Sequence, residues 1–138
     1  MMNSSIDNDY ALGFSETVAA AVVASEDVRL RRLIATSLSE VGMAVKEMRV
    51  FDALGLECGR CRLFVVDCDP LTADHAVETL RQIRQSESGN DCAIVMLSHE
   101  ESVDAYNAGV DMVLCKPVSV NMFMARVRSV MRRYKVII

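Results

Sequence analysis

The sequence lacks several features that would assign it to a special class. It has only two prolines and six glycines, which excludes collagen-like and linker-like chains. Its longest apolar run, residues 18–24, is far shorter than the roughly 20 residues of a membrane-spanning helix. Residues 1–17 contain no Lys or Arg, so no signal peptide is expected. Because 51% of the residues are hydrophobic, disorder of the whole chain is excluded, and we expect a soluble intracellular domain.

The length and the net charge of the chain indicate how many domains it forms and which ligands it does not bind. A chain of 138 residues fits one domain that can bury a core without disulfides or metal ions. Fifteen basic and nineteen acidic side chains give a net charge of −4, which argues against nucleic-acid binding as the main role. A basic cluster near the C-terminus is expected to be a solvated helix face at the favourable end of the helix dipole. Its members are Arg126, Arg128, Arg132, Arg133 and Lys135.

The five cysteines are an odd number without a secretory context, so reduced thiols are expected. Cys58 and Cys61 have the spacing of a metal or redox pair. Zinc would need two further ligands, and no second pair at comparable spacing exists. A thioredoxin-like pair would stand at the start of a helix that follows a strand, whereas this pair falls in a loop. The sequence therefore favours no functional role for this pair.

Short apolar runs alternate with segments of helical spacing. The runs lie at residues 18–24, 63–66, 93–97 and 112–114, with a weaker one at 44–50. Continuous apolarity is typical of strands that are buried on both faces, as in parallel sheets. The segments between them carry apolar residues at three- and four-residue steps, which indicates amphipathic helices. The pattern predicts an α/β fold with a doubly wound, five-stranded parallel sheet and helices on both faces.

The predicted domain covers residues 17–134. Residues 1–16 are expected to form a flexible lead-in, and residues 135–138 a C-terminal tail or the start of a linker. In such a fold the working site lies at the carboxyl ends of the strands, near the point where the strand order reverses. The informative residues are therefore those that end each apolar run.

Polar groups that suit phosphoryl chemistry end four of these runs. Carboxylates, a hydroxyl and an ammonium group would meet around one crevice there. That set suits a divalent cation with oxygen ligands beside a carboxylate that can accept a phosphoryl group. The candidate residues are Glu26, Asp27, Asp67, Asp69, Ser98 and Lys116.

At these positions the sequence resembles the receiver domain of two-component response regulators, over residues 17–134. Asp67 falls at the phosphoacceptor position and Ser98 at the family's Ser/Thr position. Lys116 and Pro117 match a Lys-Pro pair whose peptide bond is usually cis in the family. Residues 108–111 look like the family's Ala-Gly-Ala-Asp stretch. The resemblance implies a flavodoxin-like fold of the receiver type.

The resemblance also implies roles for these residues. Asp67 would accept a phosphoryl group from a histidine kinase or a histidine phosphotransfer protein. Lys116 would stabilise the phosphoryl charge and Ser98 would bind it. Mg²⁺ would be held by Glu26, Asp67 and the backbone carbonyl of Asp69. Asp27 would join the metal site if the first strand ended one residue later.

As a whole the resemblance implies a cytoplasmic signalling module rather than an enzyme. Its phosphorylation would bias a surface that involves the fourth and fifth helices. The expected partners are the phosphodonor and either an effector domain or a second copy of the chain. Neither direct binding to nucleic acid nor binding to a membrane is expected.

The sequence departs from the family pattern at several positions. Ser25 stands where the family has the first of two adjacent acids, and Glu26 stands at the second. In the loop after Asp67, Pro70 lies one position early and His75 replaces a common glycine.

Two further departures concern the switching surface. Val113 replaces the switch aromatic, and the segment from Ser98 to Ala108 is about four residues shorter than in the family. These departures favour an alternative, a degenerate pseudo-receiver that binds partners without phosphorylation. A weaker alternative, a thiol-regulated or enzymatic flavodoxin-like domain, lacks the expected Gly-rich phosphate loop after the first strand.

Overall fold

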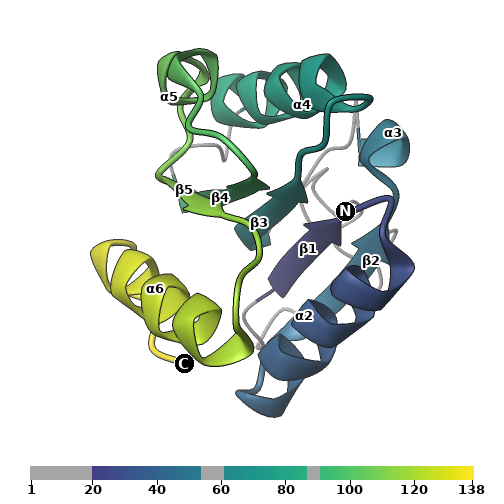
Figure 1. Cartoon of the computed structure of the whole chain (residues 1–138). Coiled ribbons are helices and arrows are strands. Elements are labelled where there is room, and N and C mark those ends of the chain that lie inside the picture. The colour runs from purple at the N-terminus through teal and green to yellow at the C-terminus, as the bar shows by residue number, and fades with distance from the viewer. Residues whose placement is uncertain (1–19, 54–60, 87–90) are drawn as a thin grey trace, which may run out of the picture.

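A computed structural model describes residues 20–53, 61–86 and 91–138 (Figure 1). The predicted lead-in and Cys58 lie outside the described residues. Within those ranges, no helix is both long enough and apolar enough to cross a membrane. In chain order the elements are β1 (Ala20–Ala24), α2 (Val28–Glu40), β2 (Ala44–Met48), α3 (Val50–Ala53), β3 (Cys61–Asp67), α4 (Ala73–Gln85), β4 (Ala93–Ser98), α5 (Val103–Ala108), β5 (Met112–Cys115) and α6 (Val120–Arg133).

Five parallel strands form one sheet in the order β2-β1-β3-β4-β5. Helices α2 and α6 cover one face of the sheet, and α3, α4 and α5 cover the other (Figure 1). The strand order reverses between β1 and β3, so the crevice at their carboxyl ends is where a doubly wound sheet places its working site. The predicted five-stranded α/β fold is confirmed.

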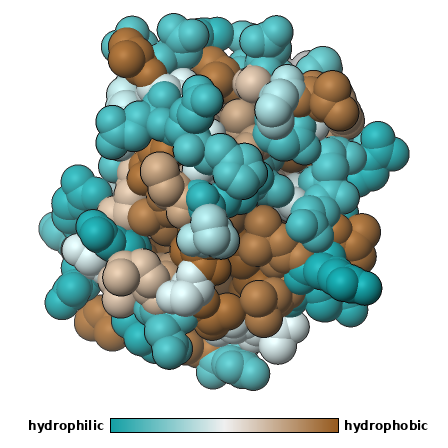
Figure 2. All heavy atoms as spheres, in the orientation of Figure 1, coloured by the Kyte–Doolittle hydropathy of each residue, from teal (hydrophilic) through white to brown (hydrophobic). Residues whose placement is uncertain are grey.

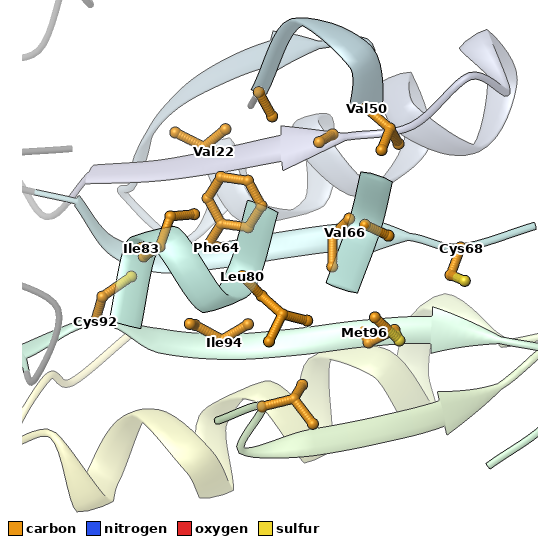
Figure 3. Packing of buried hydrophobic residues seen from close by; sticks show 14 of the residues in the cluster. Val22, Val50, Phe64, Val66, Cys68, Leu80, Ile83, Cys92, Ile94 and Met96 are labelled. Carbon is orange, nitrogen blue, oxygen red and sulfur yellow. The ribbon is translucent and has the colours of Figure 1, made fainter. Parts of the chain in front are cut away.

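The central strands are apolar on both sides because each side faces a helix layer. Alternate residues point to opposite faces of a strand, and in β3 Phe64 and Val66 face α4 while Leu63 and Val65 face α2 and α6. Figure 3 shows Phe64 packed beside Leu80 of α4 on the first of these faces. Two apolar layers on one strand explain the continuous apolar runs of the sequence.

The helix bounds follow from local capping groups. Asp27, Ser102 and Ser119 each accept a backbone N–H in the first turn of α2, α5 and α6, respectively, which satisfies donors that a helix leaves open. Gly109 ends α5 with φ 107°, a left-handed conformation that glycine adopts without strain. Helix α5 has only six residues, in keeping with the shortened segment from Ser98 to Ala108 that contains it.

An ion pair fastens β5 to the rest of the sheet. The Asp111 carboxylate lies 2.8 Å from an Arg84 guanidinium nitrogen and accepts the Ile94 N–H at 2.7 Å. Its other oxygen accepts the Tyr134 hydroxyl proton at 2.7 Å. One aspartate therefore joins α4, β4 and the end of α6 at the start of the edge strand.

Candidate functional site

The register of β1 and β3 brings Ser25 to Asp67. Ala24 pairs with Val66 in the sheet, so the next residue of each strand reaches the same crevice. The Ser25 hydroxyl donates a hydrogen bond of 2.7 Å to Asp67 Oδ2. Both residues are buried, with exposed fractions of 0% and 5%. The hydroxyl therefore satisfies one oxygen of a carboxylate that water hardly reaches.

Lys116 reaches the same carboxylate from the β5 edge of the sheet. It follows β5, and its backbone N–H donates to the Ser98 carbonyl at 2.8 Å. Its ammonium nitrogen lies 2.6 Å from Asp67 Oδ1. The Lys116–Pro117 peptide bond is cis, as the resemblance implied. Asp67 thus has one oxygen on a hydroxyl and the other on a cation.

This three-residue set, Ser25–Asp67–Lys116, can support nucleophilic chemistry at a carboxylate. A carboxylate attacks a phosphoryl group only if the added negative charge is offset, and Lys116 supplies a fixed positive charge for that purpose. Burial strengthens this interaction because the surroundings are less polarisable than water.

Ser98 and Cys68 line the crevice next to this set. Ser98 is the last residue of β4, and its hydroxyl accepts the Glu100 N–H at 3.3 Å. Burial raises the pKa of the Cys68 thiol, while Lys116 and a hydrogen bond with Ser98 oppose that shift. Ser98 therefore lies beside the Asp67 pocket, although its hydroxyl is bound to a neighbour in its own loop.

Glu26 and Asp27 serve helix starts in this structure. Glu26 Oε1 accepts the Val50 N–H at 2.8 Å, and Oε2 lies 3.2 Å from the Arg49 guanidinium. The Asp27 carboxylate accepts the N–H groups of Arg29 and Leu30. The strand predicted over residues 44–50 is shorter in the structure, because β2 ends at Met48. Helix α3 starts at Val50, and the Glu26 carboxylate binds the N–H of that residue.

Asp69 is occupied in the loop that leads to α4. Its carboxylate accepts the N–H groups of Leu71 and Thr72 at 2.8 and 3.0 Å. Its backbone carbonyl, the expected metal ligand, accepts the Thr72 N–H at 3.1 Å. The loop is thus closed by its own hydrogen bonds.

The side chains as they lie do not fit a magnesium ion. Mg²⁺ in proteins usually takes one or two carboxylates together with phosphate oxygens and water. Here the oxygens of Asp67, Glu26 and the Asp69 carbonyl all have other hydrogen-bond partners. Across the part of the chain that the structure describes, no three His, Cys, Asp or Glu side chains come together to hold a metal.

Ser25 is the site residue whose role the sequence did not reveal. It was expected only as a missing acid, yet it is a direct partner of Asp67. Arg31 supports it by donating to the Ser25 carbonyl at 3.0 Å. The available signal was its position one residue after a buried strand that neighbours β3.

An open pocket of about 320 Å³ lies against Lys116, between the start of α2 and the loop that precedes α6. Figure 2 shows hydrophobic residues gathered on the surface between α2 and α6. A mostly apolar surface therefore borders the charged crevice. The residues lining the pocket are Asp27, Leu30, Leu97, His99, Lys116, Pro117 and Val118.

Comparisons with known proteins place the fold. No protein-family model matches the chain, and a search of curated proteins gives no match. Among solved structures, the chain is similar to the chemotaxis protein CheY4 of Vibrio cholerae, with 18% identity and a TM-score of 0.70 over 82% of this chain and 98% of that one. It is also similar to a CheY-like response regulator receiver domain protein from Methanospirillum hungatei, with 14% identity and a TM-score of 0.70 over 86% and 97% of the two chains.

A third similar structure belongs to a longer protein. NtrX from Brucella abortus, solved in complex with ATP, is 21% identical with a TM-score of 0.68, over 86% of this chain and 27% of that one. At these identities the likeness is one of fold. The chain has the flavodoxin-like fold of response regulator receiver domains.

Proposed function

We propose that this chain is a receiver module of two-component signalling and that Asp67 accepts a phosphoryl group from a phosphohistidine. The contact between the Asp67 carboxylate and the Lys116 ammonium, 2.6 Å apart at the carboxyl end of a central strand, carries the proposal. The fold shared with receiver domains supports it. The phosphodonor would be a histidine kinase or a histidine phosphotransfer protein.

The proposed step forms one bond and breaks one. An Asp67 carboxylate oxygen attacks the phosphorus, and the bond between phosphorus and the imidazole nitrogen breaks. The imidazole keeps the electron pair of that bond and takes a proton. Lys116 offsets the charge of the phosphoryl oxygens, and the Ser98 hydroxyl would donate to one of them. Asp67 is left as an acyl phosphate.

The module would act by shifting the balance between two conformations. Its output would reach an effector domain or a second copy of the chain. The match to NtrX, which covers 27% of that longer chain, supports a module that works within a larger protein. We place this function in the cytoplasm, as a signalling module rather than an enzyme, without direct contact to nucleic acid or membrane.

A second candidate function is a pseudo-receiver that binds partners without phosphorylation. The hydrogen bond from Ser25 to Asp67 Oδ2 favours it, because a neutral hydroxyl contacts the acceptor carboxylate at the position where the family has an acid. Val113 in place of an aromatic residue and the six-residue α5 point the same way.

Phosphorylation by a small donor distinguishes the two candidates. The purified chain would be incubated with phosphoramidate, with and without Mg²⁺, and analysed by intact-mass spectrometry and peptide mapping. We expect one added phosphoryl group, located on Asp67. The Asp67→Asn variant should add none, whereas Asp74→Asn, a change at an exposed position of α4, should behave like the natural chain. No incorporation into the natural chain under either condition would favour the pseudo-receiver.

A further inference from the structure

We infer that Ser25 takes the place of a metal ion at this site, so that the Asp67 pocket is built to work without a bound divalent cation. The inference rests on the proposed function for the role of Asp67. It goes further because it names the residue that sets the metal requirement of the pocket. Four observations carry it.

The first observation is the direction of the Ser25 hydrogen bond. Ser25 Oγ accepts the Asp27 N–H at 3.0 Å. Its proton has two acceptors within reach, Asp67 Oδ2 at 2.7 Å and the Asp27 carbonyl at 3.3 Å, and the carboxylate is both nearer and charged. A hydroxyl donor and a metal ion both bind to the lone pairs of a carboxylate oxygen, and the Ser25 bond takes one of the two on Oδ2. Because Ser25 is fully buried, this donor is a fixed part of the pocket.

The second observation is that Glu26 is held elsewhere by two groups. To reach a metal beside Asp67 it would have to give up the Val50 N–H and the Arg49 guanidinium. The first loss would leave the buried N–H of Val50, the first residue of α3, without its acceptor, and such a loss is costly. The Glu26 carboxylate is therefore bound by the connection between β2 and α3 and is not free to bind a cation.

The third observation is the loop after β3. The Asp69 carbonyl and the Asp69 carboxylate both accept the Thr72 N–H, at 3.1 and 3.0 Å, and together they close the turn. Thr72 is itself buried, with an exposed fraction of 1%. The turn that would supply a backbone ligand is thus locked in a different role.

The fourth observation is the charge around Asp67. The Asp67 carboxylate is already paired with Lys116. The guanidinium of Arg31, which is paired with Glu47 at 3.4 Å, donates to the Ser25 carbonyl at 3.0 Å. A divalent cation bound to Asp67 would lie beside the Lys116 ammonium, which already offsets the charge of that carboxylate. Because the number and charge of ligands set the affinity of such sites, this balance opposes metal binding.

The test is a magnesium titration followed by amide NMR of the ¹⁵N-labelled full chain. The natural chain should show no saturable shifts at Ser25, Asp67 or Lys116 at millimolar Mg²⁺. The Ser25→Asp variant restores a second carboxylate, and its Mg²⁺ affinity should exceed that of Ser25→Asn by at least about tenfold. Saturable shifts at Asp67 in the natural chain would overturn the inference, as would equal affinities of the two variants.

A second measurement serves if the Ser25 variants do not fold. A cation that binds the folded state raises its melting temperature, so Mg²⁺ should shift the melting temperature of the natural chain no more than an equal concentration shifts that of Asp67→Asn. A rise confined to the natural chain would contradict the inference.

The outcome is separable from that of the proposed function. If both hold, phosphoramidate modifies Asp67 equally well in EDTA and in Mg²⁺. If only the metal-free pocket holds, neither saturable Mg²⁺ binding nor incorporation is found. If only the proposed function holds, incorporation depends on Mg²⁺ and the titration saturates.

Discussion

At Asp67, a buried carboxylate depends on two neighbours that are distant in the sequence. Ser25 lies 42 residues before it and Lys116 lies 49 residues after it. A buried ion pair adds little net stability, but removing one partner leaves an uncompensated charge. The effect of replacing one residue of this set on the free energy of unfolding should therefore depend strongly on whether its partner is present.

Replacing Lys116 tests this dependence. Lys116→Met should lower the free energy of unfolding by about 3 kcal/mol, because the Asp67 carboxylate loses its cation while it stays buried. The double variant Lys116→Met/Asp67→Asn should recover most of that loss. Urea unfolding followed by circular dichroism measures both. A double variant no more stable than Lys116→Met would show that the loss does not come from the unpaired charge.

Replacing Ser25 tests the other side of the carboxylate. Ser25→Ala removes the donor to Asp67 Oδ2, and leaving a buried acceptor unpaired costs about 1–3 kcal/mol. Ser39→Ala, an exposed position of α2, is the matched control and should change stability by less than about 0.5 kcal/mol. Equal effects of the two changes in urea unfolding would show that the hydrogen bond contributes nothing specific.

At the scale of elements, β1 is followed by three residues that serve three different structures. Ser25 points into the Asp67 pocket, Glu26 holds the start of α3, and Asp27 caps α2. The sequence placed all three at the carboxyl end of a strand, and that placement is confirmed. The turn of the backbone after Ala24, together with partners from β2 and α3, decides which of the three faces the crevice. The spacing of residues along the sequence does not reveal that turn or those partners.

The strands themselves were predictable for a physical reason. Strands β3 and β4 are buried on both faces, so their apolar runs are unbroken and their ends are marked by polar residues such as Asp67 and Ser98. The edge strand β2 is only partly buried, and its weaker pattern ran on into α3. Lys116 could be placed near Asp67 because parallel strands end at one edge, but the 2.6 Å contact needs the actual sheet order.

The role of Glu26 in α3 gives a prediction at this scale. Glu26→Ala should destabilise the chain by about 1 kcal/mol, because the Val50 N–H at the start of α3 loses its acceptor. Glu26→Gln keeps a side-chain carbonyl for this N–H and loses only the exposed pair with Arg49, so it should cost less than about 1 kcal/mol. Amide hydrogen exchange at Val50 measures the difference, with faster exchange expected only in Glu26→Ala. Unchanged exchange in Glu26→Ala would mean that Glu26 does not hold α3.

At the scale of the whole molecule, two weak acids make the stability depend on alkaline pH: the buried Cys68 thiol and the partly buried Tyr134 hydroxyl. Burial raises the pKa of the Cys68 thiol above its ordinary value of 9.0. Burial also raises the pKa of Tyr134 above 10.0, and the Asp111 carboxylate, which accepts the hydroxyl proton, raises it further. Both groups are neutral when protonated, so the folded state holds their protons more tightly than the unfolded state does.

Stability should therefore be constant with respect to these two groups below about pH 8 and should fall as the pH rises past about 9, where the unfolded thiol and phenol begin to lose protons. Urea unfolding between about pH 7.5 and pH 10.5 measures this fall. In Cys68→Ala the fall should be shallower, because one of the two groups that hold a proton in the folded state is gone. Cys115→Ala removes an exposed thiol and should leave the slope unchanged. A parallel decline in the natural chain and Cys68→Ala would assign the alkaline sensitivity to Tyr134 and its bond to Asp111, at the opposite end of the sheet from the Asp67 pocket.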